Sequence, residues 1–126
     1  MGNIKSRYYC YLFIKNAPNY IQINLNHIEK CHKQLEIIHK LETQTELLKM
    51  FNLNPNYEDW IDNIIIMCRN LSNNINELII QFKNQNTQIE NLCYEINEMK
   101  RNDRFNYNQI YIYMNSKPFY EPLLKI

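Results

Sequence analysis

The sequence has only one glycine, Gly2, and four prolines among its 126 residues. Few residues can therefore adopt a positive φ angle at low cost, which disfavours folds with many tight turns. Gly-rich phosphate loops and dinucleotide-binding fingerprints are excluded, because they need several glycines at fixed spacing. A chain of this length corresponds to one domain. We therefore expect a single domain, residues 1–126, in which long elements are joined by few turns.

The sequence also lacks an excess of charge, since Lys and Arg number 14 and Asp and Glu number 13. Binding to a phosphate backbone needs a basic surface, so we expect no nucleic-acid partner. No apolar run approaches the ~18 residues of a membrane-spanning helix. The four cysteines form no CxxC pair and follow no secretory leader, which favours a cytoplasmic protein with reduced thiols.

Catalytic motifs are missing as well. The sequence contains no nucleophile elbow, no HExxH motif and no P-loop. We therefore expect no enzyme, no catalytic residue, no metal ion and no cofactor. A small enzyme or ligand-binding domain, whose site is assembled from scattered residues, stays open as an alternative.

The residues that are present predict an α+β fold that is mostly α. Residues 7–26 are predicted to form a β-hairpin, because 7–14 are aromatic and β-branched, 16–19 have turn chemistry and 20–25 alternate with period two. Residues 27–52 show apolar positions at steps of three and four and predict a helix. The sequence around Pro55 then breaks the pattern, which indicates a helical hairpin. Residues 108–126 are predicted to form a strand and a C-terminal arm.

The strongest pattern is a heptad repeat in residues 57–102, which predicts one long coiled-coil helix. Its seam has Ile61, Cys68, Ile75, Phe82, Ile89 and Ile96 at position a, and Ile64, Leu71, Leu78, Gln85, Leu92 and Met99 at position d. The apolar stripe is wide in the first half, which requires two or more neighbours, and narrows to the seam after residue 85. A capping-box sequence, Thr87-Gln-Ile-Glu90, leaves a helix break near Asn84–Thr87 as an alternative.

The narrow part of the seam predicts contact with a protein partner, in a homo- or hetero-oligomer. The residues that we expect to make this contact are Gln85, Ile89, Leu92, Ile96 and Met99. A single polar layer in such a seam commonly fixes the register or the oligomeric state. With seven apolar or cysteine layers before Gln85 and four after it, the seam also resembles a Q-type SNARE helix. This resemblance implies a small SNARE-like or tethering factor in membrane traffic.

The first six residues match the pattern for N-myristoylation. Gly2 would follow the removed initiator, and a hydroxyl stands at position six in Ser6. One myristoyl chain binds membranes only marginally, so a second signal is needed, such as palmitoylation of Cys10 or oligomerisation. Taken together, the sequence predicts a non-catalytic coiled-coil assembly or adaptor subunit, with tethering to the cytosolic face of a membrane as a further expectation.

Overall fold

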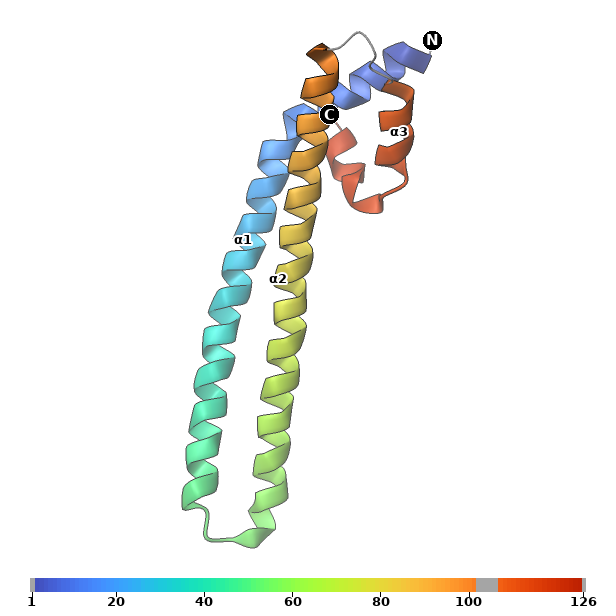
Figure 1. Cartoon of the computed structure of the whole chain (residues 1–126). Coiled ribbons are helices and arrows are strands. Elements are labelled where there is room, and N and C mark those ends of the chain that lie inside the picture. Colours follow the sequence, from blue (N-terminus) through green and yellow to red (C-terminus); the bar gives the residue numbers. More distant parts are fainter. Residues whose placement is uncertain (1, 102–106, 126) are drawn as a thin grey trace. The chain divides into compact units, whose positions relative to one another are not determined.

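The protein folds as helices throughout the part of the chain that the computed structural model describes, residues 2–101 and 107–125. The elements are α1 (Gly2–Phe51), the short 3-10 helix η1 (Pro55–Tyr57), α2 (Glu58–Arg101), α3 (Tyr107–Asn115) and the 3-10 helix η2 (Pro118–Leu124) (Figure 1). No strand occurs among these residues. The predicted α+β class is therefore wrong, and the fold is all-α.

The predicted β-hairpin at residues 7–26 is wrong because the whole segment belongs to α1. Its buried residues include Cys10, Ala17 and Asn24, which are seven residues apart and so share one helix face. Pro18 lies within the helix. Proline removes a backbone donor and bends a helix at that point. Figure 1 shows that the blue, N-terminal part of α1 changes direction.

The predicted strand and arm at residues 108–126 are also wrong, because the segment forms α3 and η2. In α3 the buried residues Ile110 and Met114 are four apart, which is the spacing of one helix face. In η2, Tyr120 and Leu123 are fully buried. Alternation of Ile and Tyr around position 111 indicated a strand, but packing against other helices decided the conformation.

The helical hairpin that the sequence predicted is confirmed. Between the helices, the Asn54 side chain accepts a hydrogen bond from the Asn56 N–H at 3.0 Å, and Pro55 begins η1. The alternative break near Asn84–Thr87 is wrong, since α2 is continuous from Glu58 to Arg101. The Thr87 hydroxyl donates to the Lys83 carbonyl at 3.1 Å, within the helix, and so does not cap a new one.

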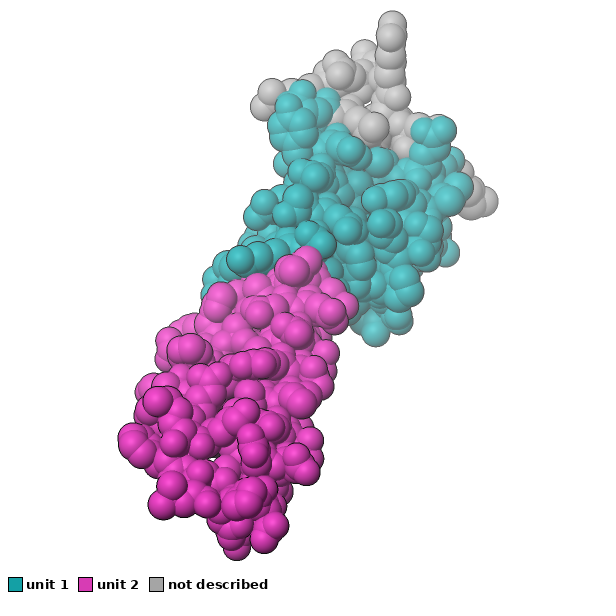
Figure 2. Space-filling view, turned by 60° about the horizontal axis from the view of Figure 1, so that its bottom comes forward, with its two compact units in different colours: residues 1–25, 83–126 teal, residues 26–82 magenta. Residues whose placement is uncertain are grey.

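The chain divides into two compact units (Figure 2). Unit 1 comprises residues 1–25 and 83–126, and unit 2 comprises residues 26–82. The core of unit 1 brings together all its helices; its buried members are Cys10, Phe13, Ala17, Ile89, Leu92, Ile96, Ile110, Met114, Tyr120 and Leu123. The rings of Phe13 and Tyr120 meet edge to face, with centroids 5.1 Å apart.

Unit 2 is an antiparallel pair of helices formed by the end of α1 and the start of α2. Its core contains Ile28, Cys31 and Ile79, with Leu35, Ile75 and Phe82 packed against them. The face of α2 that packs within the chain differs from the predicted seam by one position. The predicted a residues lie inward. The residues that share this inward face with them are others, such as Ile65 and Ile79, whereas the predicted d residues Leu71 and Leu78 are 50% and 43% exposed. The a positions were therefore correct, and the d residues Leu71 and Leu78 point away from this core.

Unit 1 also contains a buried polar layer. The Asn24 amide donates to Asn86 Oδ1 at 2.8 Å and to Gln85 Oε1 at 3.4 Å. The Asn86 amide donates to the Ile21 carbonyl at 3.4 Å. Both asparagine side chains are buried, and the bond between them is the shortest that either makes in this layer.

This hydrogen bond between the two asparagines gives a prediction about stability. Asn86→Leu leaves the Asn24 amide without its closest partner in a buried position, and we expect the free energy of unfolding to fall by about 1–3 kcal/mol. The double variant Asn24→Leu/Asn86→Leu removes both polar groups, so it should recover much of that loss. Urea unfolding followed by circular dichroism measures both. A double variant that is less stable than the single one by a further similar amount would contradict the pairing.

Candidate protein-interaction surface

The surface feature that stands out is an exposed row of large apolar side chains on unit 2. We call it the neutral apolar face, and it consists of Ile37, Leu41, Leu48 and Phe51 of α1 with Trp60, Ile64, Met67, Leu71 and Leu78 of α2. Ile64 is half-buried, and the other eight are between 43% and 76% exposed. Single exposed apolar residues are common, but a contiguous set of this size marks an interaction site.

The two helices present these residues on the same side of unit 2. In each helix the apolar residues recur at steps of three, four or seven, so they form one stripe beside the stripe that packs within the chain. Viewed from the N-terminus of each helix, the exposed stripe lies on the same side of the stripe that packs within the chain. In an antiparallel pair this places both exposed stripes on one face. A cavity of about 230 Å³ is consistent with this arrangement, because Leu48 of α1 and Trp60 of α2 line it together.

The α1 stripe continues before Gln34 to one charged residue, Lys30, and from Gln34 onward no charged residue interrupts this face. The same two stripes contain four further residues, and these are the uncharged amides Gln34, Gln44, Asn74 and Gln81. Between residues 34 and 51 of α1, and between 60 and 81 of α2, every position of the exposed stripes is therefore apolar or amide. Protein surfaces of this composition lose little electrostatic solvation when a partner covers them.

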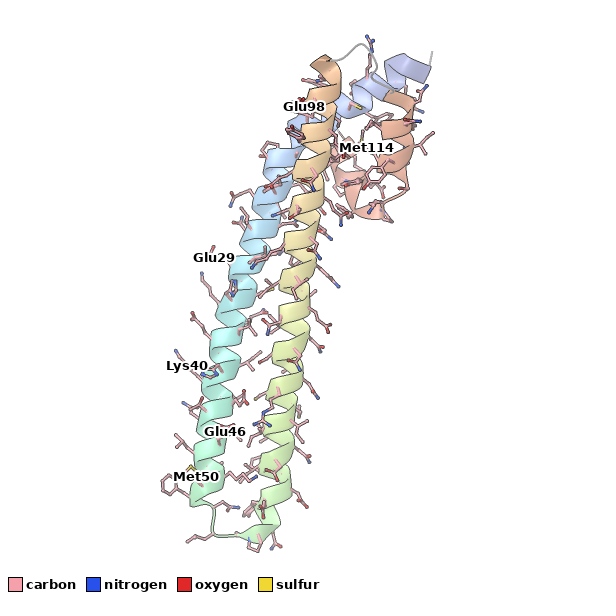
Figure 3. The ribbon with its side chains drawn as sticks, viewed as in Figure 1. Glu29, Lys40, Glu46, Met50, Glu98 and Met114 are labelled. Carbon is pink, nitrogen blue, oxygen red and sulfur yellow. The ribbon has the colours of Figure 1, made fainter. Side chains whose placement is uncertain are left out.

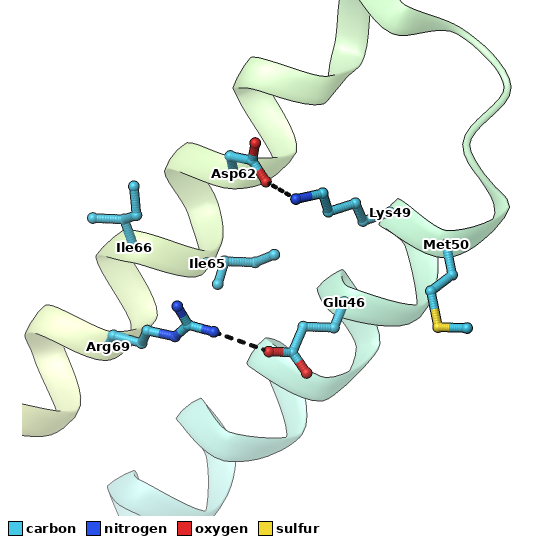
Figure 4. A pocket seen from close by; sticks show the side chains of 7 residues that line it. All are labelled: Glu46, Lys49, Met50, Asp62, Ile65, Ile66 and Arg69. Carbon is cyan, nitrogen blue, oxygen red and sulfur yellow. Dashed lines mark hydrogen bonds and ion pairs between the residues drawn. The ribbon is translucent and has the colours of Figure 1, made fainter.

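The other side of unit 2 carries the ion pairs between the helices. Lys49 Nζ lies 2.6 Å from Asp62 Oδ1, and Arg69 reaches Glu42 at 3.0 Å and Glu46 at 3.3 Å. Figure 4 shows Lys49 with Asp62, and Arg69 with Glu46, bridging the two helices across an open cavity of about 510 Å³. Hydrogen bonding to Asp62, and then its charge, raises the pKa of Lys49.

The ionisable side chains at this cavity form ion pairs with one another. The hydrogen bond that Arg69 donates to Glu42, and then the charge of Glu42, likewise raise the pKa of Arg69, so both cations hold their protons more firmly. Such groups are poor acids or bases near neutral pH. Glu29 and Lys40, which carry further charge on α1, project outward from the helix pair (Figure 3). The ion-paired side chains of unit 2 therefore lie away from the neutral apolar face.

The residues that the sequence predicted for partner contact lie in unit 1 and are engaged there. Ile89, Leu92 and Ile96 are at most 2% exposed in the core of that unit. Gln85 is half-buried and accepts a hydrogen bond from Asn24. The side chain of Met99 is outside the part of the chain that the structure describes. The narrow seam after residue 85 thus packs against other segments of the same chain.

The residues predicted for lipidation are also in α1. Gly2 is the first residue of the helix, although the sequence placed it outside every element. The Ser6 side chain is buried and its hydroxyl donates to Asn108 Oδ1 at 2.8 Å. Burial raises the pKa of the Cys10 thiol to about 11, and the charge of Lys100 lowers it by less. Because the thiolate is the nucleophile, this buried thiol is a poor acyl acceptor in the folded chain.

Sequence reasoning missed the neutral apolar face as a site, although one signal was visible. The wide apolar stripe in the first half of α2, with Met67 as a member, indicated more than one neighbour. On α1, the row of apolar positions that identified the helix combined inward residues such as Ile28 and Cys31 with Leu41 and Leu48, which belong to the neutral apolar face. Both stripes are needed to define a face.

Comparison with family models, curated proteins and solved structures finds no match in any of the three. No helix in the described ranges is long and apolar enough to cross a membrane. Among residues 2–101 and 107–125, no group of three or more His, Cys, Asp or Glu side chains is placed to hold a metal ion.

Proposed function

We propose that the protein is a non-catalytic subunit of a protein assembly and that the neutral apolar face of unit 2 is its binding surface. The observation that supports this proposal is the size and continuity of that face. Its residues are well exposed although they are among the types most often found inside proteins. Covering them would gain hydrophobic free energy in proportion to the apolar area removed from water.

The rigidity of unit 2 also supports a binding role. Both stripes lie on regular helices, joined by a short connection and held by ion pairs on the other side. A surface built on such elements loses little conformational entropy when a partner binds. Helical hairpins with one uncovered apolar face commonly complete a bundle with helices from another chain.

The other functions that the sequence left open have less support. A SNARE-like role would use Gln85 and the layers after it, but Gln85, Ile89, Leu92 and Ile96 are engaged within unit 1. The polar side chains that line the cavity of about 510 Å³ are paired with one another, which suits structure better than catalysis. Acylation of Gly2 stays a prediction. Assembly would strengthen the membrane binding that acylation gives, because several acyl chains on one complex bind a membrane jointly.

Photo-cross-linking in the cells that express the protein tests the proposal. Benzoylphenylalanine replaces Gln44, an exposed amide within the neutral apolar face, or Glu36, an exposed residue on another side of α1. We expect a covalent adduct with a protein from position 44 and none from position 36, because only the first is covered in the assembly. Equal yields at the two positions, or no adduct at either, would contradict the proposed binding surface.

A further inference from the structure

We propose that the neutral apolar face binds the same face of a second copy of this chain, so that two unit 2 hairpins form a four-helix bundle. The inference rests on the proposed function and names its partner. Three properties of unit 2 carry it: the double stripe on each helix, the absence of charge on the face, and the area that the face offers.

The double stripe is the pattern of a helix with two neighbours. In α2, residues such as Ile65, Cys68 and Ile79 are buried against α1, while Met67 and Leu71 lie on the adjoining stripe and are half or more exposed. On α1, Cys31 and Ile28 face inward, and Leu41 and Leu48 lie beside them. A helix of a two-stranded coiled coil needs only one narrow stripe. A helix of a four-helix bundle contacts two neighbours and needs both.

The lack of charged residues between Gln34 and Phe51 and between Trp60 and Gln81 on this face favours some kinds of partner over others. A partner chosen by electrostatic attraction would meet complementary charges, and the neutral apolar face offers none. An anionic membrane would be attracted by lysine or arginine bordering the apolar residues of both helices. Lysine borders only the α1 stripe, at Lys30, Lys33 and Lys40, whereas Asn63, Asn70 and Glu77 border the α2 stripe. The surface most similar to this one in composition is the same face of a second copy. Amide side chains can also donate and accept hydrogen bonds with their own kind across the contact.

The area is sufficient for a stable pair. A large apolar side chain exposes roughly 150 Å² or more when nothing covers it. Eight side chains that are between 43% and 76% exposed therefore offer about 700 Å² per chain, and two faces together would bury about 1,400 Å². Specific interfaces typically bury about 1,200–2,000 Å² in total. A symmetric contact also uses each residue twice, so the cavity beside Leu48 and Trp60 occurs twice and can receive an apolar side chain from each copy.

Trp60 makes this contact directly measurable. It is the single tryptophan of the chain and belongs to the neutral apolar face, where it is 59% exposed. Its fluorescence maximum should shift to shorter wavelength as the protein concentration rises and the second copy covers the ring. The same samples in sedimentation velocity should show a change from the mass of one chain to that of two.

The test compares two aspartate substitutions on α2. Leu71→Asp places a charge on the neutral apolar face, whereas Ile80→Asp places it at an equally exposed position on another side of the helix, 57% against 50%. Each dimer would contain two copies of the charge, so we expect Leu71→Asp to weaken association on the order of 100-fold or more, with the Trp60 emission of a single chain. Ile80→Asp should associate like the unmodified protein. Circular dichroism confirms that each variant keeps its helix content, and Leu41→Asp on α1 repeats the test if Leu71→Asp does not fold.

The outcomes separate this inference from the proposed function. Association that is lost in Leu71→Asp or Leu41→Asp and kept in Ile80→Asp supports the second copy as partner. A protein that stays a single chain at ~100 µM while position 44 cross-links to a different protein overturns the inference and leaves the proposed function standing. Association that survives both Leu71→Asp and Leu41→Asp overturns the inference. A single chain that instead sediments with phosphatidylcholine vesicles, and forms no protein adduct, overturns both.

Discussion

Replacement of Leu92 by aspartate is expected to unfold unit 1. Leu92 is 2% exposed and belongs to the same core as Phe13 and Tyr120. Truncating a buried leucine alone costs about 2–5 kcal/mol, and a buried carboxylate with no partner adds to that loss. The total, about 4 kcal/mol or more, is a large part of the stability of a small domain. Hydrogen exchange should show loss of amide protection in residues 6–24 and 107–123.

The matched control for this substitution is Leu71→Asp. Leu71 and Leu92 are three heptads apart and have the same predicted seam position, but Leu71 is 50% exposed. We therefore expect Leu71→Asp to keep amide protection in unit 1, because the introduced charge stays in contact with water. Full protection of residues 6–24 in the Leu92→Asp protein would mean that Leu92 does not belong to this core.

The contrast between these two leucines shows what a heptad pattern can predict. The repeat in α2 predicted the helix and its inward a positions correctly, because apolar residues are dense and keep one phase over the whole segment. It could not decide which neighbouring stripe packs within the chain. Residues at the observed inward positions include Ser72 and Asn86, while the competing stripe contains Leu71 and Leu78. Counting apolar residues therefore favoured the stripe that is left exposed.

The error in residues 7–26 has a related cause. The inward face of this part of α1 is formed by small or polar side chains such as Cys10, Ala17 and Asn24, and aromatic residues lie beside them. Tyrosine and β-branched residues favour strands, and Ala17-Pro18-Asn19 resembles a turn. A spacing of seven that continues from Cys10 through Asn24 to Cys31 and beyond was the available helical signal. Tertiary packing overrode local propensity because that face could be buried only as a helix.

The candidate site was also only partly accessible to sequence reasoning. The width of the apolar stripe around Met67 correctly suggested that α2 needs more than one neighbour. The sequence could not show that Ile89, Leu92 and Ile96 receive their second neighbour from residues 107–123, because no local pattern reports contacts between distant segments. Partner contact was therefore assigned to the residues that the C-terminal segment covers. The uncovered residues lie in unit 2.

Tyr120→Ala is expected to release the C-terminal segment from unit 1. Tyr120 is fully buried, and its ring lies 5.1 Å from that of Phe13 and 4.3 Å from that of Phe119. Removing a buried aromatic side chain costs about 3–5 kcal/mol, because a large cavity replaces its contacts. The segment is also attached by its other core residues, Ile110, Met114 and Leu123, and by the Asn16 amide, which donates to the carbonyls of Leu123 and Lys125 at 2.8 and 2.7 Å. Tyr120 is the largest of these buried side chains.

The Tyr120→Phe variant separates the contribution of ring packing from that of the hydroxyl group. It keeps the ring and should change the free energy of unfolding by no more than about 1 kcal/mol, since burial rather than ionisation stabilises this residue. Burial also raises the pKa of Tyr120, so its hydroxyl stays protonated in the folded chain well above neutral pH. In Tyr120→Ala, limited proteolysis should cleave within residues 107–125 faster than in Tyr120→Phe, and the thiol of Cys10 should become reactive. Equal cleavage in both variants would contradict this prediction. It would mean that the ring of Tyr120 contributes little to the attachment of the segment.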